Sequence, residues 1–489
     1  MSANANDIPM STNKDFDPNH LSNSTVCVLI GHSIEAITSA VVLASLGQRV
    51  HLYANKDILA QQLQQYGFEH HLQALWHLYE QQQMIVSQAL PDTADKLIQR
   101  YESLNNESLN HQSLSHDPAN DEALSRENDR DLEAQSTIGE PMTVGLYWVF
   151  LTSIKSVWAE DSWLTAFNHS QQQATPLIMS GIEKLGHVAV LAQRLQRAWV
   201  YYVPFVFLKD GDAYSSMLHP SLWLVGEKTA NSSEHLQILK PLTQHAHAVH
   251  RADIATIEFA RSSIMAMLAT RVSFMNEMSR LADSQQVDIR QVSHIMGLDE
   301  RVGSSYLQAG WGFGGNTLPT ELDKLQQSSQ THSLDMPLLQ SVMHINEDQK
   351  ELIFRKFWQY FNGFIDNRTV MIWGGSYKSG SGRTAGSAIH PLLALLWSYN
   401  IRTLIYSDKA QTELVTLYGD QPLFKLINTP YQQLHEAQAI FIISWSSNDQ
   451  LDINQLNQQA MPIFDAQNSL TRLQVDSLVG DYMGIGRSK

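Results

Sequence analysis

The segment from Ala309 to Pro319, AGWGFGGNTLP, is rich in glycine, the residue type that lets a backbone approach a ligand closely. Its glycines are Gly310, Gly312, Gly314 and Gly315. Backbone amides exposed in this way can bind the anionic or polar groups of a ligand. The same glycines would also suit a tight turn that binds nothing, so both interpretations stay open.

A second loop, SYKSGSGR, combines small residues with two cations, Lys378 and Arg383. An apolar helical pattern follows it, so backbone amides at a helix start and two positive charges could hold a phosphate. A plain strand-to-helix turn explains the same residues.

Thiol and metal chemistry find little support in the residue types. The single cysteine, Cys27, stands in the apolar run VCVLIG, which excludes an internal disulfide and predicts that the thiol packs as a small hydrophobic group. The histidines of QHAHAVH, His245, His247 and His250, have no carboxylate or cysteine that completes a ligand set. We therefore predict no metal site.

Two segments have the pattern of a βαβ unit. An apolar strand at 26–30 precedes Gly31, a helical pattern ending at Gly47, and a second strand at 50–53. Later, the strand TVMIWGG, the helix SAIHPLLALLWSYN and the strand RTLIYSD repeat this order, and AIFIISW adds another strand. Strand-like runs at GLYWVFLTS and at 199–208 extend the first unit.

A long helical pattern begins at Asp253 and places apolar residues on more than one face. Such a helix is buried widely, often against a partner subunit. Asp288 is a suitable N-cap for a shorter helix that ends near Gly297.

The fold class is therefore α/β, with two Rossmann-like domains joined by a helical dimerisation segment. The run at 100–137 is rich in Asp, Glu, Asn and Ser, with little to bury, which predicts a disordered insertion. The predicted divisions are a disordered tail at 1–23, an N-terminal domain at 24–225, a helical middle at 226–350 and a C-terminal domain at 365–489.

Composition limits the partners. The chain has 489 residues, 43% hydrophobic and 17% charged, enough for two or three domains with cores. A formal net charge of −16 and the lack of a basic run argue against nucleic acid. No apolar run approaches about 20 residues, and the start lacks a signal-like pattern, so we expect a cytoplasmic protein without a membrane partner.

Three middle segments resemble the nucleotide-sugar dehydrogenase family of the UDP-glucose and GDP-mannose type. They are IEFARSSIMAMLATRVSFMNEM, VDIRQVSHIMGLDERVGSSYLQAGWGFGGNTLPTELDKL and MHINEDQK. The resemblance implies NAD as cofactor, a nucleotide sugar as substrate, and two hydride transfers that convert an alcohol through an aldehyde to a carboxylate. The second step in the family uses a cysteine thioester.

The resemblance also implies that this chain differs from the family at the family's catalytic positions. Thr317 stands at the family's cysteine, Arg261 at its lysine, Met265 at its asparagine and Val206 at its hydrolytic glutamate. A threonine hydroxyl is a poor nucleophile, and an arginine keeps the charge of a lysine without its ability to release a proton. The neighbouring lysine and aspartate of the family become Thr320 and Glu321.

The family's dinucleotide fingerprint is reduced to GHSIEA. Gly31 remains, whereas Ser33 and Ala36 replace the second and third glycines, and about Ala54 replaces the acidic residue that holds the ribose. The resemblance thus implies a weakened NAD site in which Gly31 and Ser33 would still contact the cofactor.

Several nucleotide-sugar positions of the family are retained. Arg301 stands where the family contacts the sugar from a neighbouring subunit, and Tyr306 holds the aromatic place near the base. The glycines of AGWGFGG also match, and Lys378 matches a lysine on the diphosphate side, although Ala385 replaces the following arginine.

The leading hypothesis is a catalytically impaired dehydrogenase homologue of polysaccharide biosynthesis that acts as a partner, regulator or nucleotide-sugar binder. It would be a homodimer, or a heterodimer with an active paralogue as a structural subunit. The alternative is an active oxidoreductase with altered two-electron chemistry on a nucleotide sugar, in which Arg261 would serve as electrophile.

Overall fold

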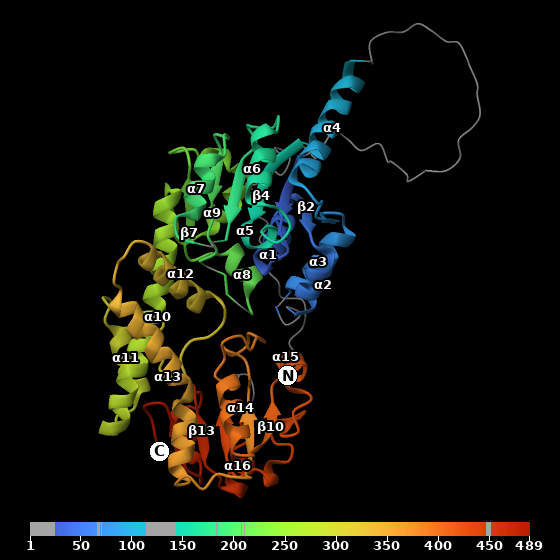
Figure 1. Ribbon diagram of the computed structural model, residues 1–489. Helices are drawn as coiled ribbons and strands as arrows, with labels where there is room; N and C mark the ends of the chain where they lie inside the picture. The colour runs from blue at the N-terminus through green and yellow to red at the C-terminus, as the bar shows by residue number, and fades with distance from the viewer. Residues whose placement is uncertain are drawn as a thin grey trace, which may run out of the picture.

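The computed structural model describes residues 25–65, 69, 71–113, 143–181, 184–206, 208–209, 211–445 and 451–489. The expected disordered tail at 1–23 lies outside these residues. Two α/β domains lie one above the other in Figure 1, and a column of helices runs along one side of both.

The N-terminal domain is built on an eight-stranded sheet with the order β3-β2-β1-β4-β5-β6-β7-β8. The strands are β1 (Thr25–Ile30), β2 (Arg49–Ala54), β3 (Ile85–Ala89), β4 (Thr143–Phe150), β5 (Leu177–Ser180), β6 (Val200–Tyr202), β7 (Trp223–Glu227) and β8 (Val249–Asp253). Neighbours pair in parallel except β6 and β7, which are antiparallel. The parallel crossovers at β1, β2 and β3 confirm the predicted Rossmann-like opening.

Helices cover both faces of this sheet because its strands are apolar on both sides. In β1, Cys27 and Leu29 belong to one buried cluster, whereas Val26, Val28 and Ile30 belong to the other. The helical elements of the domain are α1 (Ile34–Ser45), α2 (Lys56–Gln65), α3 (Leu72–Gln81), α4 (Ala94–Ser113), α5 (Leu151–Ile154), α6 (Glu160–His169), α7 (His187–Arg194), α8 (Ala213–Leu218), η2 (Ser233–His235), η3 (Gln237–Leu239) and α9 (Lys240–His245).

Two boundaries differ from those expected. The N-terminal sheet continues beyond residue 225 because β8 pairs in parallel with β7, so the helical middle starts at Ile254 and not at 226. The first part of the expected insertion, residues 100–113, forms the end of α4, in which Tyr101 is buried. Residues 114–137 lie outside the described residues.

A partly buried histidine makes this domain sensitive to acid. His51 Nδ1 lies 2.7 Å from the Tyr101 hydroxyl, and burial, with positive charge on Arg100 and Arg49, lowers the pKa of His51 from 6.5 to about 4. Because the unfolded chain takes up this proton first, the contribution of His51 to stability is complete above pH 6.5. It is lost as the pH falls towards 4.

We expect His51→Gln to flatten this part of the pH dependence, which amounts to about 3 kcal/mol at most. Urea unfolding at a series of pH values between 7 and about 4 measures it, with the exposed His77→Gln as control. Equal slopes for the wild type and His51→Gln would contradict the assignment.

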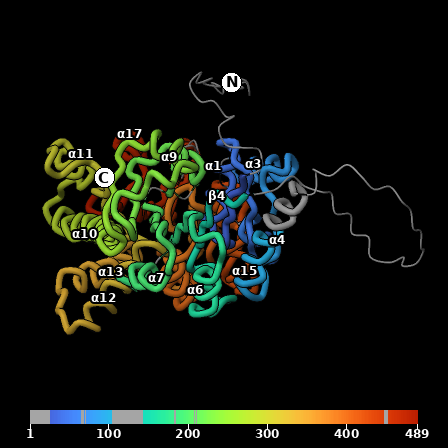
Figure 2. Tube along the Cα trace, turned by 90° about the horizontal axis from the view of Figure 1, so that it is seen from above, coloured from blue at the N-terminus to red at the C-terminus, as the bar shows by residue number. Residues whose placement is uncertain are grey.

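The helical middle consists of α10 (Ile254–Gln285), α11 (Ile289–Leu298), α12 (Thr317–Thr331) and α13 (Pro337–Tyr360). Asp253 caps α10 by accepting the amide of Thr256, and the predicted cap Asp288 accepts the amide of Arg290. The 32-residue α10 contacts both α12 and α13. Figure 2 shows these helices gathered on one side of the molecule, away from α4.

The C-terminal domain contains a six-stranded parallel sheet with the order β11-β10-β9-β12-β13-β14. Its elements are β9 (Thr369–Trp373), α14 (Ile389–Ser398), β10 (Arg402–Tyr406), α15 (Gln411–Tyr418), β11 (Phe424–Leu426), η4 (Leu434–Glu436), β12 (Ile440–Ile442), α16 (Ile453–Gln459), β13 (Ile463–Asp465), α17 (Arg472–Ser477) and β14 (Tyr482–Gly484). The predicted second βαβ unit is therefore confirmed as β9, α14 and β10.

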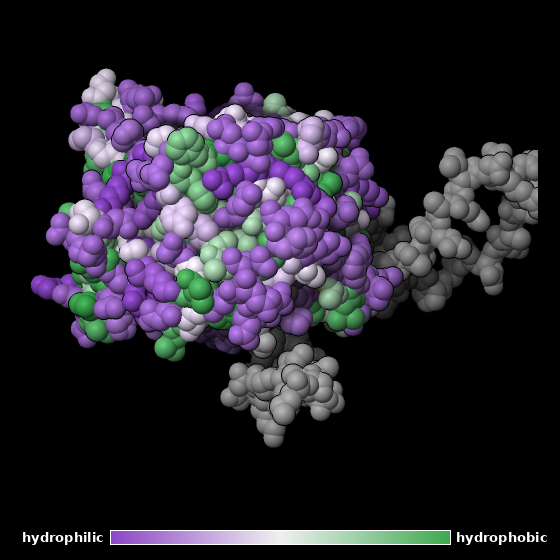
Figure 3. Space-filling model, turned by 90° about the horizontal axis from the view of Figure 1, so that it is seen from below, coloured by the Kyte–Doolittle hydropathy of each residue, from purple (hydrophilic) through white to green (hydrophobic). Residues whose placement is uncertain are grey.

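The lower face of the molecule in Figure 3 is mainly hydrophilic, with apolar residues in scattered spots. In the part of the chain that is described, no helix combines the length and hydropathy needed to cross a bilayer.

Candidate functional site

The glycine-rich loop at 309–316 lies between α11 and α12 and touches the C-terminal domain. The amide of Gly315 donates to the carbonyl of Ala385 at 2.8 Å. A Cβ atom on Gly315, which has φ +74°, would lie 2.8 Å from the ring of Tyr377. The structure thus brings together the two loops that the sequence singled out, AGWGFGG and SYKSGSGR.

Three amide side chains from α10 and α13 hold this loop. Asn276 accepts the amide of Gly310 at 2.9 Å, and Gln349 donates to the Gly310 carbonyl at 2.9 Å. Asn346 accepts the amide of Phe313 at 2.7 Å and donates to the carbonyl of the same residue at 3.1 Å. All three are almost fully buried, so they replace water as partners of the loop backbone.

Sequence reasoning assigned no role to these amides, although Asn346 and Gln349 stand in the motif MHINEDQK. Their spacing on one helix face was the available signal, since residues three apart are neighbours on a helix surface. Asn346 also explains one glycine: a Cβ on Gly312 would lie 2.5 Å from its Oδ1 atom, and Gly312 has φ +111°.

Arg261 and Glu321 form an ion pair between α10 and α12. The pair is enclosed, because the side chains are only 14% and 3% exposed. Glu321 also accepts the hydroxyl of Ser262 at 3.0 Å and lies 3.5 Å from the Lys324 ammonium. The guanidinium is thus directed at a carboxylate of this chain.

The other sequence-predicted catalytic positions carry side chains without an ionisable group. Thr317 is the exposed first residue of α12, one turn before Glu321. Met265 is buried in α10, one turn after Arg261. Val206 follows β6 and packs against the cores on both faces of the N-terminal sheet. None of these three side chains can act as an acid or base at neutral pH.

Two further ionisable groups lie near the Arg261 pair. Burial raises the pKa of the Tyr202 phenol, so its hydroxyl stays protonated. Glu258 accepts the amides of Val188 and Ala189 at 3.0 and 2.9 Å, at the start of α7, while burial raises its pKa. Both side chains are therefore part of the packing between α10 and the N-terminal sheet.

The carboxyl end of β1 carries the reduced fingerprint. A Cβ on Gly31 would lie 2.7 Å from Cβ of Phe150, so close packing between strands accounts for this glycine. Ser33 accepts the amide of Ala36 and caps α1. Ala54 at the end of β2 is fully buried and has no side-chain group that could bind a ribose hydroxyl.

Three retained positions are accessible. Arg301 is 89% exposed and pairs with Asp299 at 2.6 Å, and Tyr306 is 46% exposed. Lys378 is exposed on the loop that touches the glycine-rich loop. These side chains can meet a ligand without a change in the core.

The remaining candidates for reactive chemistry lie elsewhere. Cys27 is in the centre of the N-terminal sheet, 1% exposed, and burial raises the pKa of its thiol to about 12. It therefore cannot reach a ligand at the glycine-rich loop. Among the described residues, no group of three or more His, Cys, Asp and Glu side chains is arranged to hold a metal ion.

Residues 255–348, which include α10 to α12 and the glycine-rich loop, match the central domain of the UDP-glucose/GDP-mannose dehydrogenase family. The similarity to that family is therefore shown for this segment of the chain. The resemblance read from the sequence motifs is thereby confirmed.

Curated relatives extend the similarity along the chain. A UDP-glucose 6-dehydrogenase of Pseudomonas aeruginosa is 28% identical over 290 residues, covering 58% of this chain and 64% of the relative. A UDP-glucose 6-dehydrogenase of Rickettsia bellii is 25% identical over 284 residues, covering 57% of this chain and 65% of the relative. The match thus spans slightly less than two thirds of each relative.

Solved structures support the fold over nearly the whole chain. A UDP-glucose dehydrogenase from Pyrobaculum islandicum superposes with a TM-score of 0.71 at 17% identity, covering 96% of this chain and 100% of that one. A UDP-D-ManNAc dehydrogenase from Pyrococcus horikoshii gives 0.67 at 14% identity, covering 94% and 99%. At this identity the likeness establishes the two-domain α/β architecture.

Proposed function

We propose that this chain is a nucleotide-sugar-binding member of the dehydrogenase family whose oxidative chemistry is impaired. The Arg261–Glu321 ion pair carries the proposal. A guanidinium that is enclosed with a carboxylate has its charge compensated by that partner. It is therefore a poor stabiliser of the oxyanion that alcohol oxidation generates.

The lack of an accessible thiol supports the same proposal for the aldehyde step. A thioester requires a sulfur nucleophile at the reacting carbon. Thr317 offers a hydroxyl at the start of α12, whereas the thiol of Cys27 is enclosed in the sheet. Aldehyde oxidation through a covalent enzyme intermediate would have no nucleophile here.

The proposed cofactor behaviour follows from the ends of β1 and β2. NAD fits the fold class, because a dinucleotide binds at the carboxyl ends of such strands and its pyrophosphate meets a helix start. Gly31 and the first turn of α1 after Ser33 could hold that pyrophosphate. Since Ala54 is buried and offers no carboxylate to the ribose, we expect NAD to bind weakly.

The loop at 309–316 and Lys378 support retained binding of the nucleotide sugar. The loop backbone is already ordered by Asn276, Asn346 and Gln349, so a ligand would not have to order it. Lys378 adds a positive charge for a diphosphate.

We expect the purified full chain to bind UDP-glucose or GDP-mannose in calorimetry without forming NADH. Turnover should stay below about 10⁻³ s⁻¹, against roughly 10 s⁻¹ for a typical enzyme. Lys378→Ala should weaken binding, and the exposed Lys56→Gln should leave it unchanged. NADH formation at an ordinary rate would overturn the proposal, and one NADH per sugar would indicate a single two-electron oxidation.

We also propose that α10 forms a dimer interface. Its exposed apolar residues Phe259, Met267, Phe274 and Leu281 are 44–60% exposed and recur every seven or eight residues. Two helical turns separate them, so they form one stripe on the face turned away from α12 and α13. A second copy of the chain would cover this stripe and could bring its Arg301 to the glycine-rich loop of the first copy.

Phe274→Glu is expected to raise the dimer dissociation constant at least about 30-fold, because a charge would be buried in an apolar contact. Analytical ultracentrifugation measures this change. Leu417→Glu on α15, where the leucine is 57% exposed, is the matched control. A wild-type chain that is monomeric alone and pairs only with a coexpressed active paralogue would replace the homodimer by a heterodimer.

A further inference from the structure

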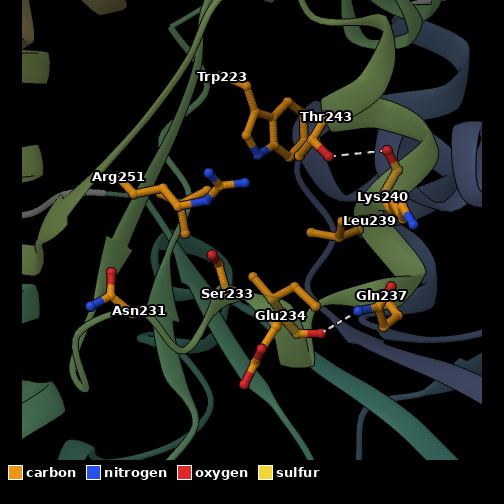
Figure 4. A pocket seen from close by; sticks show the side chains of 11 residues that line it. Trp223, Asn231, Ser233, Glu234, Gln237, Leu239, Lys240, Thr243 and Arg251 are labelled. Carbon is orange, nitrogen blue, oxygen red and sulfur yellow. Dashed lines mark hydrogen bonds between the residues drawn. The ribbon is translucent and has the colours of Figure 1, made fainter.

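A pocket of about 410 Å³ lies in the N-terminal domain, outside the segment that matches the family. Trp223 and Val225 of β7 form its floor. Arg251 enters from the neighbouring strand β8, where it is the residue paired with Val225. The segment from η2 to α9 forms the opposite wall. In Figure 4 the guanidinium of Arg251 reaches into the middle of the pocket, between Trp223 and Ser233.

The pocket favours an anion. Arg251 and Lys240 line it, and among the described residues neither forms an ion pair. The one acidic lining residue, Glu234, lies 3.8 Å from the ring of His235, and Figure 4 shows its carboxylate turned away from Arg251. A guanidinium with free donors can bind phosphate oxygens in pairs.

The wall beside Arg251 is held in place without a ligand. The buried carboxylate of Glu227 accepts the amides of Asn231 and Ser233, both at 2.9 Å. The hydroxyl of Tyr201 donates to the carbonyl of Ser232 at 2.6 Å. Asn231 and Ser233 are thereby fixed at the rim, which lowers the entropy cost of binding.

The lining residues also indicate the chemical class of the ligand to which the anionic group belongs. Asn231, Ser233, Gln237 and Thr243 offer amide and hydroxyl groups that suit a ligand rich in hydroxyls, above a floor of indole and aliphatic carbon. A volume of about 410 Å³ lies at the lower end of the range for small-molecule sites.

We propose that this pocket binds a monosaccharide phosphate, with the phosphate on Arg251 and the sugar hydroxyls on the amide and hydroxyl side chains. The pocket is separate from the glycine-rich loop and does not depend on the function proposed for that loop.

Calorimetry of the full chain with glucose 1-phosphate tests the proposal, with inorganic phosphate and glucose as comparison probes. We expect a dissociation constant below about 1 mM for glucose 1-phosphate, at least about tenfold tighter than for either fragment. Arg251→Gln should weaken binding at least about tenfold, and Arg251→Lys should weaken it less. Lys56→Gln on α2 is the matched control.

Saturating UDP-glucose should leave the binding of glucose 1-phosphate unchanged, because the two ligands would occupy different sites. Displacement by UDP-glucose, or unchanged affinity in a folded Arg251→Gln variant, would overturn the proposal. Equal affinity for inorganic phosphate would overturn the sugar part of it. Thermal unfolding of each variant verifies that the edge strand β8 remains folded.

Discussion

Glu321→Leu is expected to lower the free energy of unfolding by about 3–5 kcal/mol. The substitution removes the partner of the Arg261 guanidinium, which is only 14% exposed and would remain enclosed without a compensating charge. It also removes the acceptor of the Ser262 hydroxyl. Urea unfolding at pH 7 measures the loss.

A double variant separates the cost of an unpaired charge from the value of the pair. Arg261→Met with Glu321→Leu should recover most of the stability, because two apolar side chains can replace a buried ion pair. Glu347→Leu on α13, where the carboxylate is 69% exposed beside Lys350, is the control and should change stability much less. If Glu321→Leu behaved like this control, the enclosed ion pair would be the wrong description.

Asn346→Ala is expected to cost about 3 kcal/mol and to release the glycine-rich loop. Asn346 satisfies both the amide and the carbonyl of Phe313, and alanine would leave these buried groups without their partner. Because the loop carries the proposed nucleotide-sugar site, affinity for UDP-glucose should fall at least about tenfold.

His344→Ala is the matched control, since His344 is exposed on the same helix and should alter neither stability nor affinity. Unfolding experiments and calorimetry on the two variants decide between the outcomes. A loss of stability in Asn346→Ala with unchanged affinity would contradict the role of the loop in binding. Unchanged stability would contradict its clamping by Asn346.

Much of the local structure could be predicted from the sequence. The strand, glycine and helix order around Gly31 and the cap at Asp288 depend on neighbouring residues, and the structure contains both. The family followed from long ordered motifs, and the match at 255–348 confirms it. Local patterns of this kind can be recognised in the sequence, because hydrophobic periodicity and helix capping depend on residues only a few positions apart.

The boundaries were less well predicted. The run at 199–208 looks like one long strand, but only Val200–Tyr202 pairs in the sheet. The polar run from residue 100 looked disordered, yet its first part continues α4 through residue 113. Burial of Tyr101 against His51 and Tyr53 anchors that helix, and this contact spans about fifty residues of sequence.

The sequence by itself determined the α/β class, the helical middle and the residue types at 206, 261, 265 and 317. Only the tertiary structure decided that the charge of Arg261 meets Glu321, that β8 extends the first sheet, and that Arg251 enters a pocket above Trp223. Each of these depends on segments far apart in the chain. Their juxtaposition comes from packing of whole sheets and helices, which local periodicity and propensity do not specify.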